Sequence, residues 1–185
     1  MKVAVIGGIG CGKSEVMLAF EKAGYTVLSA DKINAQLWED ECYIDTLKTA
    51  FPEAVIDGTI TRASLGSVIF CDKDKLQRLN AISHPLIVGK IVNAEGDNVA
   101  VELPLAVESG ILDTFDLVCM VDTKKSIRLK RLEGRGLTRK RAKEIMAVQV
   151  PIRTLKRCAD IIIKNNGTRE QVFSKATAIA NAIKD

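Results

Sequence analysis

The stretch Gly7-Gly8-Ile9-Gly10-Cys11-Gly12-Lys13-Ser14 decides the fold, since it follows a short apolar run at Lys2 to Ile6 and precedes a segment with helical spacing. It fits the pattern G-x-x-x-x-G-K-[ST] at every fixed position, in the strand, loop and helix setting that a Walker A loop requires. Its glycines let backbone amides wrap phosphate oxygens in conformations that a Cβ would forbid. The helix that follows directs its positive end at the same phosphates. The stretch therefore predicts a site for a nucleoside triphosphate.

Roles for individual side chains follow from this loop. Lys13 is expected to reach the β and γ phosphates of ATP, and the Ser14 hydroxyl to ligate Mg²⁺. Because a helix N-terminus lowers the pKa of a nearby thiol, we expect Cys11 to react with alkylating agents, although it has no predicted part in catalysis. The residues of this stretch that we expect to bind the nucleotide are Gly8, Ile9, Gly10, Cys11, Gly12, Lys13, Ser14 and Glu15.

Apolar runs of strand length alternate with helical segments along the chain. Most runs are apolar at consecutive positions, as expected of strands that are covered on both faces. The alternation predicts an α/β fold of P-loop NTPase type, a three-layer sandwich around a five-stranded parallel sheet. We expect one domain over residues 1–185, with a core at 1–30, 96–123 and 158–185, a helical substrate lobe at about 31–95 and a helical lid at about 124–157. The runs are Lys2 to Ile6, Thr26 to Ser29, Asn98 to Leu103, Leu117 to Val121 and Asp160 to Ile163.

Charge and composition limit the possible partners. The formal net charge of +4 is modest, but residues 124–157 hold thirteen Lys or Arg against two acids, a net +11 that leaves −7 for the rest. Something anionic should therefore dock on that segment, and its lack of aromatic residues argues against nucleic acid. The five cysteines include no C-x-x-C pair, and no signal peptide or membrane-length apolar run is present. These features favour a soluble cytoplasmic protein without a disulfide framework or zinc site, and without a membrane partner.

Asp31 comes directly after the second apolar run. Because ligands gather at the carboxyl ends of parallel strands, Asp31 should face the cleft beside the Walker A loop. A carboxylate in that place can orient an acceptor hydroxyl and take its proton. The alternative is that Asp31 only caps the helix that follows. The residues alone leave both roles open.

Three arginines of the basic segment, Arg128, Arg131 and Arg135, have the spacing i, i+3, i+7 and would share one face of a helix. Three neighbouring cations repel one another without a counter-charge, and the guanidinium fork suits phosphate. We expect this cluster to bind ATP phosphates, chiefly through Arg131 and Arg135. A solvated helix face is the alternative.

Several motifs together resemble the dephospho-CoA kinase family, from Gly7 to about Gly167. The resemblance implies transfer of the ATP γ-phosphoryl group to the 3′-hydroxyl of dephospho-CoA, the last step of coenzyme A synthesis. The chain departs from the family pattern at Ala35 and Leu155, where a basic residue is usual. The motifs are the Walker A loop, the Ala30-Asp31 pair, Leu79-Asn80-Ala81-Ile82-x-His84-Pro85-Leu86, Val101-Glu102-Leu103-Pro104-Leu105 with Glu108, and Asn165-x-Gly167.

The resemblance also implies roles for residues. Asp31 becomes the catalytic base, acting with Lys13 and Arg135 in a direct in-line transfer. Asn165 joins the ATP site. Nucleoside or nucleoside-monophosphate kinases of the same fold, and a non-catalytic nucleotide-binding paralogue, remain as alternatives. We expect a small-molecule substrate and a monomer or weak homo-oligomer. The acceptor side would include Asp31, His84, Pro104 and Glu108, the last with a structural role as an equal alternative.

Overall fold

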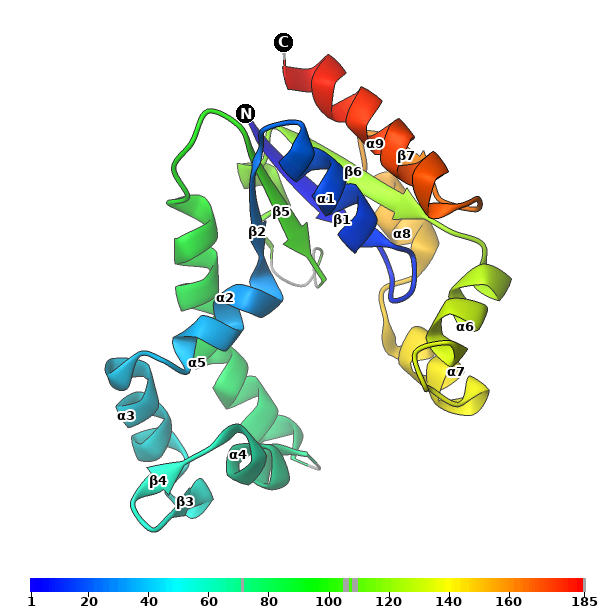
Figure 1. Ribbon diagram of the computed structural model, residues 1–185. Coiled ribbons are helices and arrows are strands. Elements are labelled where there is room, and N and C mark those ends of the chain that lie inside the picture. Colours follow the sequence, from blue (N-terminus) through cyan, green and yellow to red (C-terminus); the bar gives the residue numbers. More distant parts are fainter. Residues whose placement is uncertain (71, 105–106, 108–109, 185) are drawn as a thin grey trace. The chain divides into compact units, whose positions relative to one another are not determined.

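The computed structural model describes residues 1–70, 72–104, 107 and 110–184. The chain divides into two compact units (Figure 1). Unit 1 comprises Met1–Ala30 and Ala94–Asp185, and unit 2 comprises Asp31–Asn93. The loop at Gly7 to Ser14 and the basic segment at 124–157 both belong to unit 1.

Unit 1 is built on a parallel sheet, as the sequence predicted. In the described part of the chain the sheet has five strands in the order β2-β5-β1-β6-β7, so the strand that leads into the Walker A loop is central. The register pairs Ile6 at the end of β1 with Leu103 on one side and Met120 on the other. The ends of β1, β5 and β6 therefore lie at one edge of the sheet. The strands are β1 (Lys2–Ile6), β2 (Thr26–Ser29), β5 (Val99–Leu103), β6 (Leu117–Asp122) and β7 (Ile161–Lys164).

Helices cover both faces of this sheet, which confirms the three-layer α/β fold. α1 (Lys13–Lys22) and α9 (Arg169–Lys184) pack together on one face, where Phe20 and Ala176 are fully buried. The Tyr25 hydroxyl donates to the Ala180 carbonyl at 3.1 Å and ties β2 to α9. α8 (Ile152–Arg157) packs against β6 on the other face.

The basic segment forms helices that continue from β6. α6 (Lys125–Glu133) is followed by α7 (Arg139–Val148), which leads into α8. Leu129, Leu132 and Ala142 make a small core between α6 and α7, and Ile9 of the Walker A loop packs against it. This contact fixes the first turns of α6 beside the loop.

Unit 2 consists of helices and a short hairpin. The helices are α2 (Ala30–Leu37), α3 (Glu41–Ala50), α4 (Arg62–Ile69) and α5 (Lys73–Val92), with a 3-10 turn η1 (Pro52–Ala54). A separate core that includes Leu37, Leu47, Phe51 and Leu65 holds the unit together.

The hairpin in unit 2 lies in an interval that we read as mostly helical from the sequence. Strands β3 (Val55–Ile56) and β4 (Thr59–Ile60) pair antiparallel. They are joined by Asp57 and Gly58, which have φ values of 49° and 75°. Two consecutive positive φ values are typical of a type I′ turn, for which Asp-Gly is a preferred sequence. Local turn chemistry therefore specifies this element.

The sequence predicted neither a membrane span nor a disulfide framework. Within the described residues, no helix is both long enough and apolar enough to cross a membrane. Cys11, Cys42, Cys119 and Cys158 are free thiols, and Cys71 lies outside the described residues.

A 3-10 turn η2 (Leu112–Thr114) precedes β6 and completes the described elements of unit 1.

Candidate active site

The Walker A loop adopts a conformation that needs its glycines. Gly10 and Gly12 have φ values of 76° and 89°, in the left-handed region that glycine enters without steric cost. A Cβ on Gly12 would also lie 2.4 Å from the Asn165 side-chain nitrogen. Lys13 begins α1, and its Nζ donates to the Gly7 carbonyl at 3.1 Å. The left-handed glycines and the contact from Lys13 to Gly7 thus give the loop the tight turn that a phosphate cradle requires.

Three side chains from distant parts of unit 1 hold this loop by one atom, the Cys11 carbonyl oxygen. Asn165 Nδ2 donates to it at 2.8 Å, Thr123 Oγ1 at 2.9 Å and Arg131 Nη1 at 3.2 Å. Arg131 Nη2 also donates to Asn165 Oδ1 at 3.1 Å. Asn165 is 1% exposed, so its observed contacts are with the loop and its supports. Its predicted contact with the nucleotide stays a prediction.

Arg128 reaches the other end of the loop from α6. Its side chain is 4% exposed, and its Nε donates to the Ile9 carbonyl at 2.7 Å. Gln149 Oε1 accepts from the Ile9 amide at 2.9 Å and from Arg128 Nη2 at 3.3 Å. Burial lowers the pKa of the Arg128 guanidinium from its usual value. Gln149 thus places an oxygen between a loop amide and a cation, two donors that suit a phosphate oxygen.

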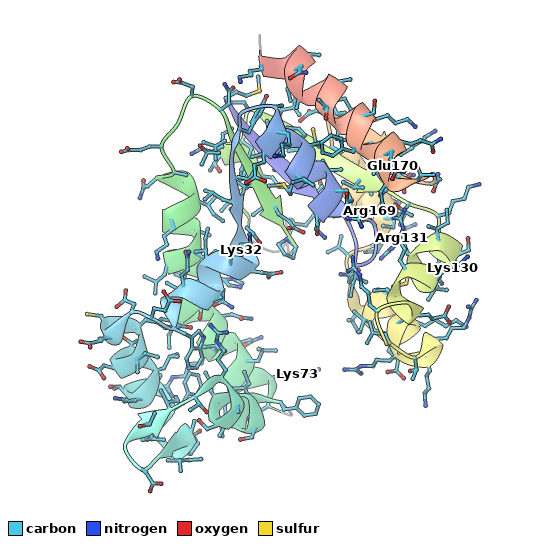
Figure 2. All side chains as sticks on the ribbon, in the orientation of Figure 1. Lys32, Lys73, Lys130, Arg131, Arg169 and Glu170 are labelled. Carbon is cyan, nitrogen blue, oxygen red and sulfur yellow. The ribbon has the colours of Figure 1, made fainter. Side chains whose placement is uncertain are left out.

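Arg135 does not share the helix face that the spacing predicted. α6 ends at Glu133 with its C-cap at Gly134, and Arg135 is exposed in the turn that follows. Arg128 and Arg131 both contact the loop, and Arg131 is seen on α6 in Figure 2. The expectation of one three-arginine face is therefore wrong, because α6 ends at Glu133, two residues before Arg135.

Cys11 also differs from the sequence-based expectation. Its side chain is 1% exposed, and burial raises the pKa of the thiol, an effect larger than the opposing influence of Lys13. The predicted lowering of its pKa is wrong, since desolvation disfavours the thiolate. An exposed, reactive thiol is not present at this position.

Two acidic residues at strand ends had no role assigned from the sequence. Glu102 is the penultimate residue of β5, and its Oε1 lies 3.7 Å from Lys13 Nζ. Asp122 ends β6, and its Oδ2 lies 2.7 Å from Lys156 Nζ. The signal that singled out Asp31, an acid at the carboxyl end of a parallel strand, applies equally to both.

Two residues near the Walker A loop offer oxygen donors for a magnesium ion. Ser14 lies exposed in the first turn of α1, so its hydroxyl and the Glu102 carboxylate offer hard oxygen donors of the kind that Mg²⁺ prefers. The described residues hold no group of three or more His, Cys, Asp or Glu that could bind a metal by itself.

Glu15 forms an ion pair with Arg169, and Arg169 is labelled at the start of α9 in Figure 2. Leu155 is 6% exposed, and the neighbouring Lys156 is the cation that reaches the sheet edge.

In unit 2, Asp31 lines a pocket of about 330 Å³. Arg62 lines the same pocket, with its guanidinium 5.6 Å from the centre of the Trp38 ring and donating to the Ala35 carbonyl at 2.7 Å. His84 lies on α5 and is partly buried. In unit 1, Pro104 directly follows β5 and is partly buried, and Glu108 lies outside the described residues.

Comparison with known proteins identifies the family. The family model described as dephospho-CoA kinase matches residues 1–171. The chain belongs to the dephospho-CoA kinase family. A dephospho-CoA kinase from Shouchella clausii is 36% identical over 185 residues, which cover 94% of this chain and 93% of the relative.

Solved structures agree with this assignment. The dephospho-CoA kinase from Campylobacter jejuni superposes with a TM-score of 0.75 at 27% identity, over 100% of this chain and 98% of the other. A crystal structure of a Thermus thermophilus protein gives a TM-score of 0.82 at 28% identity, over 99% and 97% of the two chains. The predicted α/β kinase fold, the enzyme class and the use of ATP that the dephospho-CoA kinase family implies are confirmed.

Proposed function

We propose that this member of the dephospho-CoA kinase family transfers the γ-phosphoryl group of Mg·ATP directly to the 3′-hydroxyl of dephospho-CoA. The observation that carries the proposal is the Walker A loop, held in its phosphate-binding shape by Asn165, Thr123 and Arg131. Every recognised part positions a group or neutralises charge, and none is an activated nucleophile. Direct in-line transfer therefore fits this site better than a phospho-enzyme.

ATP binding would begin by displacing the Gln149 side chain from the Walker A loop. The Ile9 amide is occupied by Gln149 Oε1 at 2.9 Å. A phosphate oxygen is a stronger acceptor than a carboxamide oxygen, and Arg128 stands ready to donate to it. Lys13 would then bind the β and γ phosphates in exchange for the Gly7 carbonyl. Arg135, in its exposed turn, would approach the transferring group as charge develops on it.

Magnesium would supply a positive charge between the phosphate oxygens. The Ser14 hydroxyl and the Glu102 carboxylate are the residues that would hold it, together with the nucleotide itself. Mg²⁺ usually keeps several waters and uses only one or two carboxylates, which agrees with this sparse donor set.

The acceptor step is assigned to Asp31. Its carboxylate lines the pocket that contains Arg62 and Trp38, so the acceptor ribose would lie where Asp31 can take the hydroxyl proton. Arg62 lies beside Ala35 and would provide the cation that the family pattern places at position 35. His84 and Pro104 are proposed to contact the same acceptor. We propose a cytoplasmic setting and a monomer or weak homo-oligomer.

Replacement of Asp31 by Asn tests the base. We expect kcat to fall by about 10²- to 10⁴-fold, because general base catalysis is lost, while the Kd of ATP stays unchanged. ADP release with dephospho-CoA gives kcat, and calorimetry gives the Kd. Asp45→Asn is the matched control, since Asp45 is an exposed acid on α3 whose carboxylate has 74% exposure. A kcat of Asp31→Asn close to that of the control would mean that Asp31 is only an acid in the first turn of α2 and not the base.

A further inference from the structure

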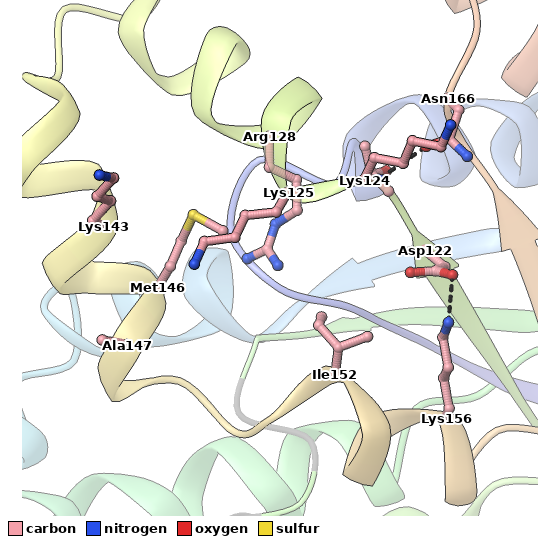
Figure 3. Close-up of a pocket in the computed structure, with 11 residues that line it drawn as sticks. Asp122, Lys124, Lys125, Arg128, Lys143, Met146, Ala147, Ile152, Lys156 and Asn166 are labelled. Carbon is pink, nitrogen blue, oxygen red and sulfur yellow. Dashed lines mark hydrogen bonds and ion pairs between the residues drawn. The ribbon is translucent and has the colours of Figure 1, made fainter.

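A basic pocket lies in unit 1, outside the Walker A loop (Figure 3). Its volume is about 490 Å³, and it is bounded by the end of β6 and by α6, α7, α8 and Asn166. No residue of the loop from Gly7 to Ser14 lines it. Its lining includes one acid, Asp122, and the cations Lys124, Lys125, Arg128, Lys143 and Lys156.

Most of this positive charge has no internal counter-charge. The Asp122 carboxylate is paired with Lys156 at 2.7 Å, as the dashed line in Figure 3 shows. Among the described residues no carboxylate lies within 4.0 Å of the other four lining cations. Like charges held around one pocket repel, so an anion that binds among them relieves that repulsion.

The burial of Arg128 also favours an anion in the pocket. Only 4% of it is exposed, and its hydrogen-bond partners, the Ile9 carbonyl and Gln149 Oε1, are neutral oxygens. A buried guanidinium without a charged partner is costly to desolvate. A bound anion in the pocket would add to the attraction that Asp122 already exerts on Arg128.

The dimensions and the lining narrow the class of anion. The free cations come from two elements, the start of α6 and α7, so a ligand with two charged groups can pair with both. Met146 and Ile152 add an apolar wall, which suits the organic part of a ligand. An organic diphosphate has two charged groups and an apolar part to match.

We propose that this pocket binds the diphosphate group of a nucleotide-type ligand, as a second anion site separate from the Walker A loop. Both the acceptor dephospho-CoA and a second molecule of ADP carry that group. The lysines of the site have no part in the proposed phosphoryl transfer, and Arg128 is the lining cation that it shares with the Walker A loop.

Calorimetry on the intact protein tests this site. The Walker A loop is first saturated with magnesium and a non-hydrolysable ATP analogue, and inorganic pyrophosphate is then titrated. We expect one further binding event per chain. In the double variant Lys125→Ala/Lys143→Ala, pyrophosphate affinity should fall about tenfold or more, because charged hydrogen bonds are lost. The affinity for the ATP analogue should change by less than about twofold, since the loop is intact.

The matched control is Lys130→Ala/Lys140→Ala, which removes two exposed lysines from the same helices outside the pocket. It should bind pyrophosphate like wild type. No heat from pyrophosphate, equal affinity in the two double variants, or equal loss of both ligands in Lys125→Ala/Lys143→Ala would overturn the proposal.

Competition with bound pyrophosphate then distinguishes dephospho-CoA from ADP as the source of the diphosphate group. Displacement of pyrophosphate by dephospho-CoA identifies the acceptor as the ligand, and displacement by ADP alone identifies a second nucleotide. Failure of both to displace it would overturn the assignment to an organic diphosphate. Absence of coenzyme A formation in the same preparation would count against the proposed function and leave this site standing.

Discussion

Replacement of Asn165 by Ala probes the support of the Walker A loop. Asn165 is 1% exposed and lies 154 residues from Cys11, whose carbonyl it binds at 2.8 Å. The substitution removes that bond and the one from Arg131 Nη2 to Asn165 Oδ1 at 3.1 Å. It adds no new group, so its effect reports the contribution of these contacts.

The magnitude follows from the two bonds. A neutral hydrogen bond contributes about 0.5–1.5 kcal/mol and one with a charged donor about 1.5–3 kcal/mol. Their loss predicts a decrease of about 2–4 kcal/mol in the free energy of unfolding of unit 1. Each kcal/mol corresponds to a fall in Tm of about 2–4 °C for a chain of this size. ATP affinity should fall too, because the loop is less preorganised.

Urea denaturation and calorimetry with Mg·ATP measure the two effects. Asn166→Ala is the control, since Asn166 is the exposed neighbour and its Oδ1 accepts one exposed bond from the Lys124 amide. That variant should lose at most about 1 kcal/mol. If Asn165→Ala is as mild as Asn166→Ala in both measurements, the loop does not depend on Asn165.

Three further predictions concern the loop and the buried thiols. Gly8→Ala would place a Cβ 2.4 Å from Arg128 Nη2, so the guanidinium must move, and calorimetry should show about a tenfold weaker Kd for ATP; an unchanged Kd would contradict the packing. Maleimide labelling followed by mass spectrometry should modify exposed Cys42 rapidly and buried Cys11 only in denaturant; equal rates would contradict the burial. Burial raises the pKa of Cys119 to about 12, so the unfolded thiol ionises first and stability is lost as pH rises above about 9. Cys119→Ala should reduce that decline by up to about 1.4 kcal/mol per pH unit in urea unfolding at pH 8 to 10, and an identical slope would refute the assignment.

The elements that the sequence predicted best are those with local signals. The apolar runs and the Walker A pattern were enough for the parallel sheet, because both depend on residues close together in the chain. The hairpin at Asp57-Gly58 had an equally local signal, a preferred type I′ dipeptide inside a segment whose pattern is otherwise helical.

Other features depend on contacts between distant residues. The three donors to the Cys11 carbonyl are the residue after β6, a residue of α6 and the residue after β7, and no spacing rule pairs them. Burial of Cys11 reversed the direction of its pKa shift for the same reason. The helix face that Arg135 was expected to share failed on a local signal, since Gly134 ends α6 before it. Glu102 carried the same local signal as Asp31, but its contact with Lys13 joins residues that are distant in the chain.

The central claim is that the cradled phosphate is transferred to an alcohol. Incubation of the protein with Mg·ATP and dephospho-CoA, followed by mass spectrometry with fragmentation, tests it most directly. We predict one equivalent of coenzyme A per ADP formed, with the new phosphate on the 3′ position of the ribose, and no product from Lys13→Ala. Hydrolysis of ATP without a phosphorylated acceptor, or equal product from Lys13→Ala, would contradict it.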